Sequence, residues 1–118
     1  MAGIARLPTA KKPTYWVGSS REELRAFPAS VRKVMGFALM LAQLGEKHPS
    51  AKALRGFHGA SVQEIVDDHA GNTFRAVYSV QFKGAVYVLH AFQKKSKKGI
   101  ATPLSDIRLI KERLKTLK

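Results

Sequence analysis

The chain has 118 residues, with 21 Lys and Arg against 8 Asp and Glu, which gives a formal net charge of +13. This length predicts one domain, and the positive charge predicts a polyanionic partner, nucleic acid first, with an acidic polypeptide as a compatible second. The absence of cysteine excludes disulfides, thiolate nucleophiles and cysteine-type zinc sites, and the four histidines lack metal-ligand spacing.

Membrane and cofactor functions find no support in the sequence. No apolar run reaches the roughly 20 residues that a membrane-spanning helix needs, and the N-terminus has no apolar signal core. We therefore expect a cytoplasmic protein without a membrane partner. We expect no metal or small-molecule cofactor, because acidic residues are few and the pair Asp67-Asp68 alone is a poor Mg²⁺ site.

The N-terminal part of the chain predicts a basic arm, a strand and two helices. Residues 1–13 are basic and lack periodicity, which predicts a flexible arm ahead of a single domain over residues 14–118. Tyr15–Val17 predicts a short strand. The sequence Ser20-Arg21-Glu22-Glu23 has the capping-box form, with Ser20 as the cap, and predicts a helix to about Phe27. Apolar residues at helical spacing predict a second helix over Ser30–Leu44, packed on a sheet.

Strands dominate the middle of the chain. Ala51–Phe57 predicts a linker or an irregular strand, and Val62–Asp68 predicts a strand that carries an acidic cluster. The clearest signal is a hairpin, in which Thr73–Phe82 alternates apolar and polar residues, Lys83-Gly84 forms the turn, and Ala85–Gln93 returns antiparallel.

A two-residue turn in this hairpin sets its register. Phe82 would face Ala85, Arg75 would lie opposite Phe92, and Val77 would lie opposite His90. Arg75, His90, Phe92 and Lys94 would then converge at one end of one sheet face. A one-residue bulge at the turn would undo this register.

A cationic loop follows the last strand. The stretch Tyr87–Lys98 begins as a buried strand and ends with Lys94, Lys95, Lys97 and Lys98. Loops on a rigid scaffold often carry binding groups, and a solvated lysine loop kept for solubility explains this stretch equally well. Thr102 as cap, Pro103 at the first helical position and Asp106 in the first turn then predict a C-terminal helix. Its apolar stripe is Ile107, Ile110, Leu114 and Leu117.

Three motifs occur in a characteristic order. They are Leu54-Arg55-Gly56, Phe74-Arg75-Ala76-Val77-Tyr78, and His90-Ala91-Phe92-Gln93-Lys94-Lys95-Ser96 leading into Thr102-Pro103 and Asp106-Ile107. Over about Thr14–Leu117 the chain resembles the RelE/HigB superfamily of toxins from type II toxin–antitoxin systems, in its phage-derived HigB-like branch. The resemblance implies an α+β fold: an antiparallel sheet of four to five strands, two N-terminal helices packed on it and one C-terminal helix. It also implies a ribosome-dependent mRNA endoribonuclease with an antitoxin partner, expected to be a helix-turn-helix protein. The few acidic residues predict that this endoribonuclease is metal-independent.

The same resemblance suggests site residues. Arg75 matches the family's arginine that contacts the scissile phosphate, and Lys94 and Lys95 match basic residues that follow the last strand. Two features depart from the family. Some members carry lysines on the strand matched by Val62–Asp68, where this chain has Gln63, Glu64, Asp67 and Asp68, and no tyrosine follows the basic loop.

The residues themselves add further candidates. His90 is a candidate general base or acid because imidazole titrates near neutral pH; its alternative is a packed strand residue. Lys52, Arg55, Lys97 and Lys98 are candidates for contact with the RNA backbone, and their alternative is ordinary surface charge.

Three other functions remain open. The chain could be a plain nucleic-acid-binding module, a basic protein that binds an acidic polypeptide, or a toxin-like protein that has lost cleavage and keeps only antitoxin binding. The missing strand lysines keep the last of these in consideration.

Overall fold

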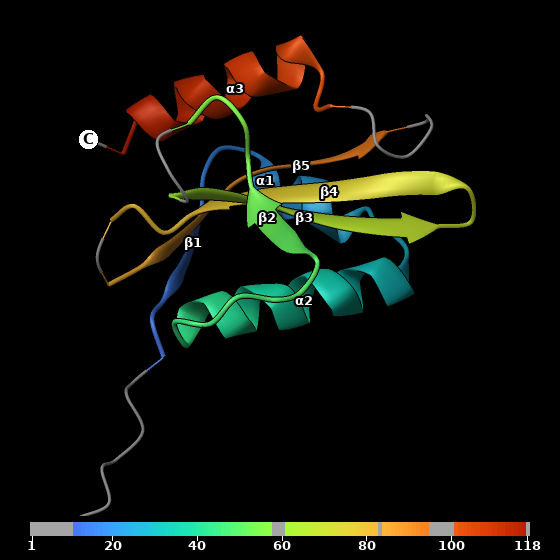
Figure 1. Cartoon of the computed structure of the whole chain (residues 1–118), viewed down its shortest axis with the longest axis horizontal. Coiled ribbons are helices and arrows are strands. Elements are labelled where there is room, and N and C mark those ends of the chain that lie inside the picture. Colours follow the sequence, from blue (N-terminus) through green and yellow to red (C-terminus); the bar gives the residue numbers. More distant parts are fainter. Residues whose placement is uncertain (1–10, 58–60, 83, 95–100, 118) are drawn as a thin grey trace, which may run out of the picture.

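The computed structural model describes residues 11–57, 61–82, 84–94 and 101–117. The elements in chain order are β1 (Thr14–Trp16), α1 (Ser20–Arg25), α2 (Ala29–Gln43), β2 (Ala51–Ala53), β3 (Val62–His69), β4 (Asn72–Ser79), β5 (Val86–Lys94) and α3 (Leu104–Lys115) (Figure 1). Lys95, Lys97, Lys98 and most of the predicted arm lie outside the described residues. Among the helices described, none is both long enough and apolar enough to cross a membrane.

One five-stranded sheet organises the chain, in the order β1-β5-β4-β3-β2. The central strands are antiparallel, as predicted. The edge strand β1 departs from that prediction, because it pairs with β5 in parallel, with Thr14 opposite Val86. Backbone N–H groups of Val86 and Val17 extend this pairing by donating to Pro13 and Val88. Pro13, which the sequence places in the flexible arm, therefore takes part in the edge of the sheet.

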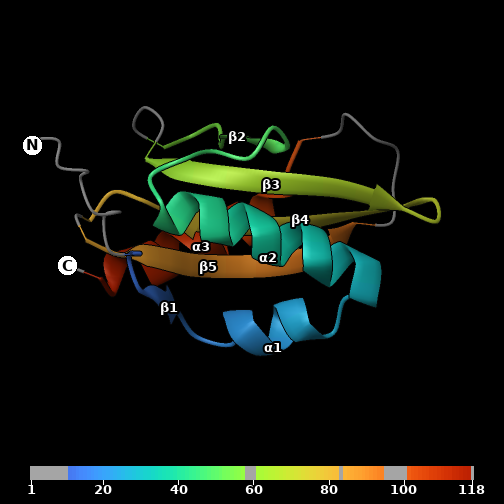
Figure 2. The same cartoon turned by 90° about the horizontal axis from the view of Figure 1, so that it is seen from below.

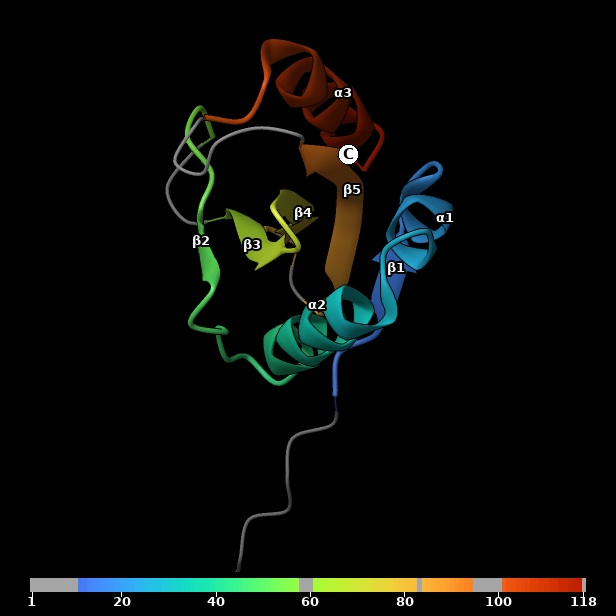
Figure 3. The ribbon, with the colours of Figure 1, turned by 90° about the vertical axis from the view of Figure 1, so that its right-hand side faces the viewer.

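Helices cover both faces of the sheet. Figure 3 shows α2 on one side, α3 on the other, and α1 beside the β1 edge; Figure 2 shows α2 lying across the strands. The alternation of β4 explains this layering, because Phe74, Ala76 and Tyr78 join the α2-side core while Val77 packs with Ile110 of α3. The predicted faces of this strand are therefore confirmed.

The central hairpin is shorter than predicted. Strand β4 ends at Ser79 rather than Phe82, and β5 begins at Val86, so the predicted pair of Phe82 with Ala85 is wrong. The physical reason is local: the Ser79 hydroxyl accepts the backbone N–H of Gln81, which ends the regular ladder.

A bulge lies inside this hairpin rather than at its turn. Val77 pairs with His90 and Tyr78 with Val88, so Leu89 is the extra residue on β5. On the far side of the bulge the predicted register holds, with Arg75 opposite Phe92 and Thr73 opposite Lys94. The half of the hairpin that carries the candidate site residues is therefore aligned as predicted.

Two helix starts differ from the sequence prediction. The N-cap of α1 is Ser19 rather than Ser20, whose buried hydroxyl donates to the carbonyl oxygen of Val88 on β5. Helix α3 begins at Leu104 with Pro103 as its N-cap, and Thr102 does not cap it. In both cases a tertiary hydrogen bond takes the hydroxyl that the local pattern assigns to a cap.

An ionic contact ties α1 to α3. The Arg113 Nη1 atom of α3 lies 3.2 Å from Glu23 Oε1 of α1 and donates to the Leu89 carbonyl oxygen at 2.8 Å. Glu23 Oε1 also accepts the backbone N–H of Ala91 on β5. Gly18 lies against Arg113 with a φ of +58°, and a β-carbon there would sit 2.8 Å from Arg113 Nε. Glu23 and Arg113 therefore join the two helices to each other and to the backbone of β5.

We expect Gly18→Ala to lower the free energy of unfolding by about 1–2 kcal/mol, because a left-handed φ is unfavourable for a residue with a β-carbon. The matched control is Gly36→Ala on the exposed side of α2, where a β-carbon meets nothing within 4 Å. There, alanine should raise stability by about 0.5–1 kcal/mol through helix propensity. Urea unfolding of both variants measures the two effects, and a Gly18→Ala variant as stable as the wild type would contradict the left-handed conformation at Gly18.

The surroundings of Glu23 predict a response to acid. Burial acts to raise the pKa of Glu23, but hydrogen bonds from Arg113, the Ala91 backbone, Ser19 and His90 outweigh it and lower the pKa from 4.5 to about 2. A carboxylate with a lowered folded-state pKa contributes stability above its unfolded pKa and loses that contribution as the pH falls through the folded value.

We therefore expect Glu23→Gln to lower stability at neutral pH and to flatten the decline between pH 4.5 and about 2. The exposed Glu22→Gln on the same helix removes the same charge and should keep the wild-type decline. Urea unfolding over a pH series measures both, and equal acid profiles for the two variants would show that the contacts of Glu23 do not stabilise the fold.

Candidate functional site

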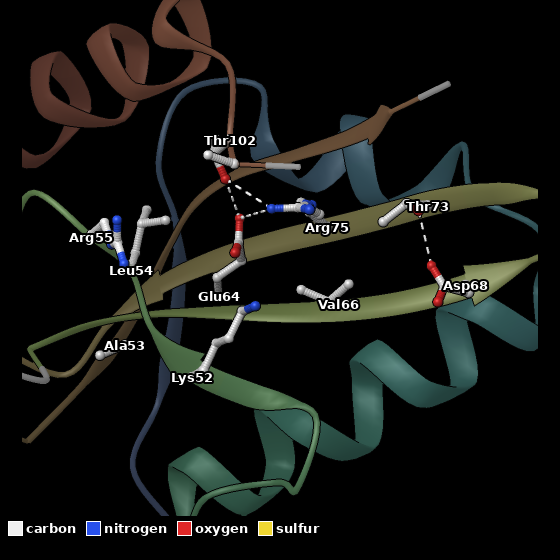
Figure 4. Close-up of a pocket in the computed structure, with 11 residues that line it drawn as sticks. Lys52, Ala53, Leu54, Arg55, Glu64, Val66, Asp68, Thr73, Arg75 and Thr102 are labelled. Carbon is white, nitrogen blue, oxygen red and sulfur yellow. Dashed lines mark hydrogen bonds and ion pairs between the residues drawn. The ribbon is translucent and has the colours of Figure 1, made fainter. Parts of the chain in front are cut away.

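A cavity of about 430 Å³ opens at the β2 side of the sheet, on the face that α3 covers (Figure 4). Its walls come from β2, β3, β4 and the two residues before Pro103. The lining residues are Lys52, Ala53, Leu54, Arg55, Glu64, Val66, Asp68, Thr73, Arg75, Ala101 and Thr102. This volume lies in the range of small-ligand sites, and three of the predicted site residues, Lys52, Arg55 and Arg75, line it.

Arg75 forms the centre of the cavity wall. Its side chain is 5% exposed, and its Nη1 atom donates to Glu64 Oε2 and to Thr102 Oγ1, each at 3.1 Å. The Thr102 hydroxyl also donates to Glu64 Oε2, so the three groups contact one another (Figure 4). A buried guanidinium needs a partner of opposite charge, and the carboxylate of Glu64 on the neighbouring strand supplies it.

Strand register explains why Glu64 and Arg75 meet. Arg75 pairs directly with Val66, and Glu64 lies two residues further along β3 on the same face. A long side chain reaches such a diagonal neighbour. The hairpin that sets this register turns through Ala70 and Gly71, both with positive φ, in agreement with the predicted turn.

Lys52 and Arg55 are exposed at the mouth of the cavity. Lys52 lies on β2 and pairs with Glu64 in the β2–β3 ladder, and Arg55 follows Leu54, whose side chain is buried under α3. Both cations therefore stand beside the buried Arg75–Glu64 pair. With Asp68 also in the wall, the cavity holds three cations against two carboxylates.

Lys94 lies next to this cavity. It pairs with Thr73 in the β4–β5 ladder, and its Nζ donates to the carbonyl oxygen of Ala101 at 2.6 Å. Burial and then the charge of Arg75 lower the pKa of Lys94, while Glu64 and Asp106 partly oppose this. Arg75 and Lys94 contact the consecutive residues Thr102 and Ala101, so the two cations lie on the same side of the molecule as predicted.

His90 lies apart from the residues that line the cavity. Its Nδ1 is 3.0 Å from Glu23 Oε1 and its Nε2 is 2.7 Å from Asp106 Oδ1, while its ring stacks on Phe92 with centroids 4.9 Å apart. Carboxylates only accept hydrogen bonds, so both contacts are hydrogen bonds only when both ring nitrogens carry hydrogen. The neighbours of both His90 ring nitrogens are therefore carboxylates, and His90 does not line the cavity.

The sequence does not identify two of the cavity residues. It predicts Thr102 to be a helix cap, and it marks Glu64 only as a departure from the lysines that some family members carry on this strand. Pairing Val62–Asp68 with the next strand around Ala70-Gly71 would have placed Glu64 diagonal to Arg75. Nothing local would have found Thr102, because its partners lie 27 and 38 residues away.

The described residues show no group of three or more His, Asp or Glu side chains arranged to hold a metal ion. Lys95, Lys97 and Lys98, which the sequence adds to the site, lie outside the described residues. The described residues therefore form a mixed-charge cavity with one buried arginine.

Comparison with known proteins adds to this geometry. Residues 22–115 match the family described as phage derived protein Gp49-like (DUF891). No curated protein matches the sequence significantly. Among solved structures, the chain is similar to the E. coli toxin RelE, in a double arginine-to-alanine mutant in the free state, with a TM-score of 0.57 and 17% identity. The match covers 92% of this chain and 100% of that one.

The family match spans most of the chain and includes every element from α1 to α3 except the first two residues of α1. The structural likeness agrees with the α+β fold implied by the RelE/HigB resemblance. This chain therefore belongs to the phage-derived Gp49-like family and has the fold of RelE.

Proposed function

We propose that the chain is the toxin of a type II toxin–antitoxin system and that it cleaves mRNA on the ribosome, in the cytoplasm, without a metal ion. The observation that carries the proposal is the cavity in which Arg75 lies between Glu64 and Thr102, with Lys52 and Arg55 at its mouth. The Gp49-like family and the RelE fold support the assignment to toxins. The net charge of +13 favours approach to a ribosome-bound RNA.

The proposed reaction uses the nucleophile that RNA itself carries. The 2′-hydroxyl loses its proton and attacks the adjacent phosphorus, a 2′,3′-cyclic phosphate forms, and the 5′-oxygen leaves with a proton. Arg75 would bind the non-bridging phosphate oxygens through its planar fork and stabilise the charge that develops there. The phosphate must share or replace the carboxylate of Glu64, which holds Arg75 in the free protein.

Proton transfers fall to neighbouring groups. Lys94, with its lowered pKa, would donate the proton to the leaving oxygen, and Lys95, which follows it in the sequence, remains the second candidate for this role and for charge stabilisation. Glu64 is the carboxylate beside Arg75 in the cavity, and it can accept the 2′-hydroxyl proton once the phosphate engages the guanidinium. Lys97 and Lys98 remain candidates for contact with the RNA backbone.

The test of the catalytic role is Arg75→Lys, which keeps a positive charge beside Glu64 but loses the fork that grips two phosphate oxygens. We expect cleavage of ribosome-bound message to fall by about 10²–10³-fold, the typical effect of removing one charge-stabilising donor. Mapping message ends over time in a purified translation system measures the rate, and circular dichroism checks the fold. Arg32→Ala on the exposed side of α2 is the control. A wild-type rate in Arg75→Lys would show that the two-point contact of the guanidinium with the phosphate plays no part in the reaction.

A non-catalytic RNA-binding module of the same fold is the second candidate. The observation that favours it is that Glu64 neutralises Arg75 in the free protein, on a strand without the lysines of some relatives. End mapping separates the two functions, because a module that only binds leaves the message intact when the wild-type protein is added to translating ribosomes.

Both candidates predict that Lys52 and Arg55 contact RNA phosphates. Lys52→Ala and Arg55→Ala should each weaken binding of single-stranded RNA and lower the slope of log affinity against log salt by about 0.7–1. Lys33→Ala on α2, across the sheet from the cavity, should leave the slope unchanged. Fluorescence anisotropy over a salt series gives the slopes. If all three variants lose the same amount, binding follows total charge rather than this cavity.

The proposed antitoxin partner has a surface that would suit it. Phe37 and Met40 of α2 and Leu44, the residue that ends this helix, are 50%, 36% and 50% exposed. An exposed apolar stripe of this kind is typical of protein interfaces. An acidic partner, as a helix-turn-helix antitoxin could be, would also offset the net positive charge of the chain.

A further inference from the structure

We propose that His90 is a positioning residue, which holds Asp106 so that the segment before α3 closes the wall of the cavity. This inference rests on the proposed function, because it concerns the same cavity. It assigns His90 a part in shaping the site rather than in proton transfer to RNA. His90 contacts α3, and the residues just before α3 contact the cavity.

The first step is the contact of His90 with both helices. The imidazole lies between Glu23 of α1 and Asp106 of α3, at 3.0 Å and 2.7 Å, and is 5% exposed. Arg113 of α3 is the other charged group in the cluster, at 3.2 Å from Glu23. With His90 doubly protonated, two cations balance two carboxylates. Loss of one proton would leave a ring lone pair facing a carboxylate oxygen and an unbalanced negative charge.

The second step leads from Asp106 to the cavity. Asp106 lies in the first turn of α3, where the backbone N–H of Ile107 donates to the Pro103 carbonyl oxygen. The two residues before Pro103 are cavity residues: Ala101 accepts from Lys94, and Thr102 contacts Glu64 and Arg75. A displacement of this turn would move the Thr102 hydroxyl away from the buried ion pair.

The first turn of α3 has little apolar burial and no side-chain cap. No side chain caps the helix, and Leu104 is 66% exposed. Ile110, in the second turn, is the α3 residue that is fully buried among those described. Ile107 of the first turn is partly buried against the α3-side cluster, and Ala101 and Thr102 are held by Lys94, Arg75 and Glu64. The pair of His90 with Asp106 adds a side-chain hydrogen bond that ties the first turn itself to β5.

A role in proton transfer would need a free ring nitrogen directed into the cavity. Both nitrogens of His90 instead lie at hydrogen-bond distance from carboxylates of α1 and α3, and His90 is not among the cavity residues. The two roles make different predictions for a double variant, since a positioning residue acts only through its partner.

The experiment is a double-mutant cycle of His90→Gln and Asp106→Asn in the full chain. Hydrogen exchange of the α3 first-turn amides is measured by NMR, and cleavage of ribosome-bound message is measured in parallel. We expect each single variant to raise exchange at Ile107 and Arg108 by about tenfold, and the double variant to raise it no further. Cleavage should fall by about tenfold in each single variant, with no further loss in the double.

His69→Gln, which removes a histidine bonded to Ser30 on the other side of the sheet, is the control and should behave as the wild type.

Several outcomes would overturn the proposal. First-turn exchange that stays at the wild-type rate in both single variants means that the pair does not position α3. Cleavage losses that multiply in the double variant mean that His90 acts independently of Asp106. If His90→Gln does not fold, exchange and cleavage in Asp106→Asn decide. A wild-type protein that cleaves no message removes the proposed function, whereas the exchange data still decide whether His90 positions the Thr102 wall.

Discussion

Four ionisable side chains are buried on the face of the sheet that α3 covers, and each has a polar or charged partner there. They are Glu64, Arg75, His90 and Lys94. Their partners come from one another, from Glu23 of α1, and from the segment around the start of α3: Thr102, the Ala101 carbonyl oxygen and Asp106. A buried charge left without a partner is strongly destabilising, so these pairs tie the start of α3 to β4 and β5.

The two faces of the sheet bury different kinds of side chain. On the α2 side, residues such as Met35, Ile65 and Tyr78 form an apolar core that stabilises the fold by burial alone. On the α3 side, a smaller apolar cluster around Ile110 lies next to the buried residues Glu64, Arg75, His90 and Lys94, which together form a charged layer. Buried ion pairs add little net stability compared with apolar residues of the same size. The charged layer is therefore better explained by geometry and function than by stability.

The proposed site and the proposed positioning residue share this layer. Arg75 lies opposite Phe92, the ring of which stacks on His90, so the cavity and the His90 cluster are adjacent on the same strands. The bulge at Leu89 lies between the apolar part of the hairpin and this charged part. A polyanion that entered the cavity would meet cations already held in place, at the expense of the Arg75–Glu64 contact.

The sequence by itself determined the features that depend on periodicity. The alternation of β4, the apolar stripes of α2 and α3, and the motifs of the family follow from which residues repeat at which spacing. The pair of Arg75 with Phe92 was predicted from a two-residue turn that the structure does not have, and it is present because the bulge at Leu89 offsets the one-residue shift of the register near the turn. Tertiary structure alone decided the parallel pairing of β1 and the partners of Glu23, His90 and Thr102. These contacts join residues far apart in the chain, and a capping serine or threonine carries no sign that a buried charge elsewhere will claim its hydroxyl.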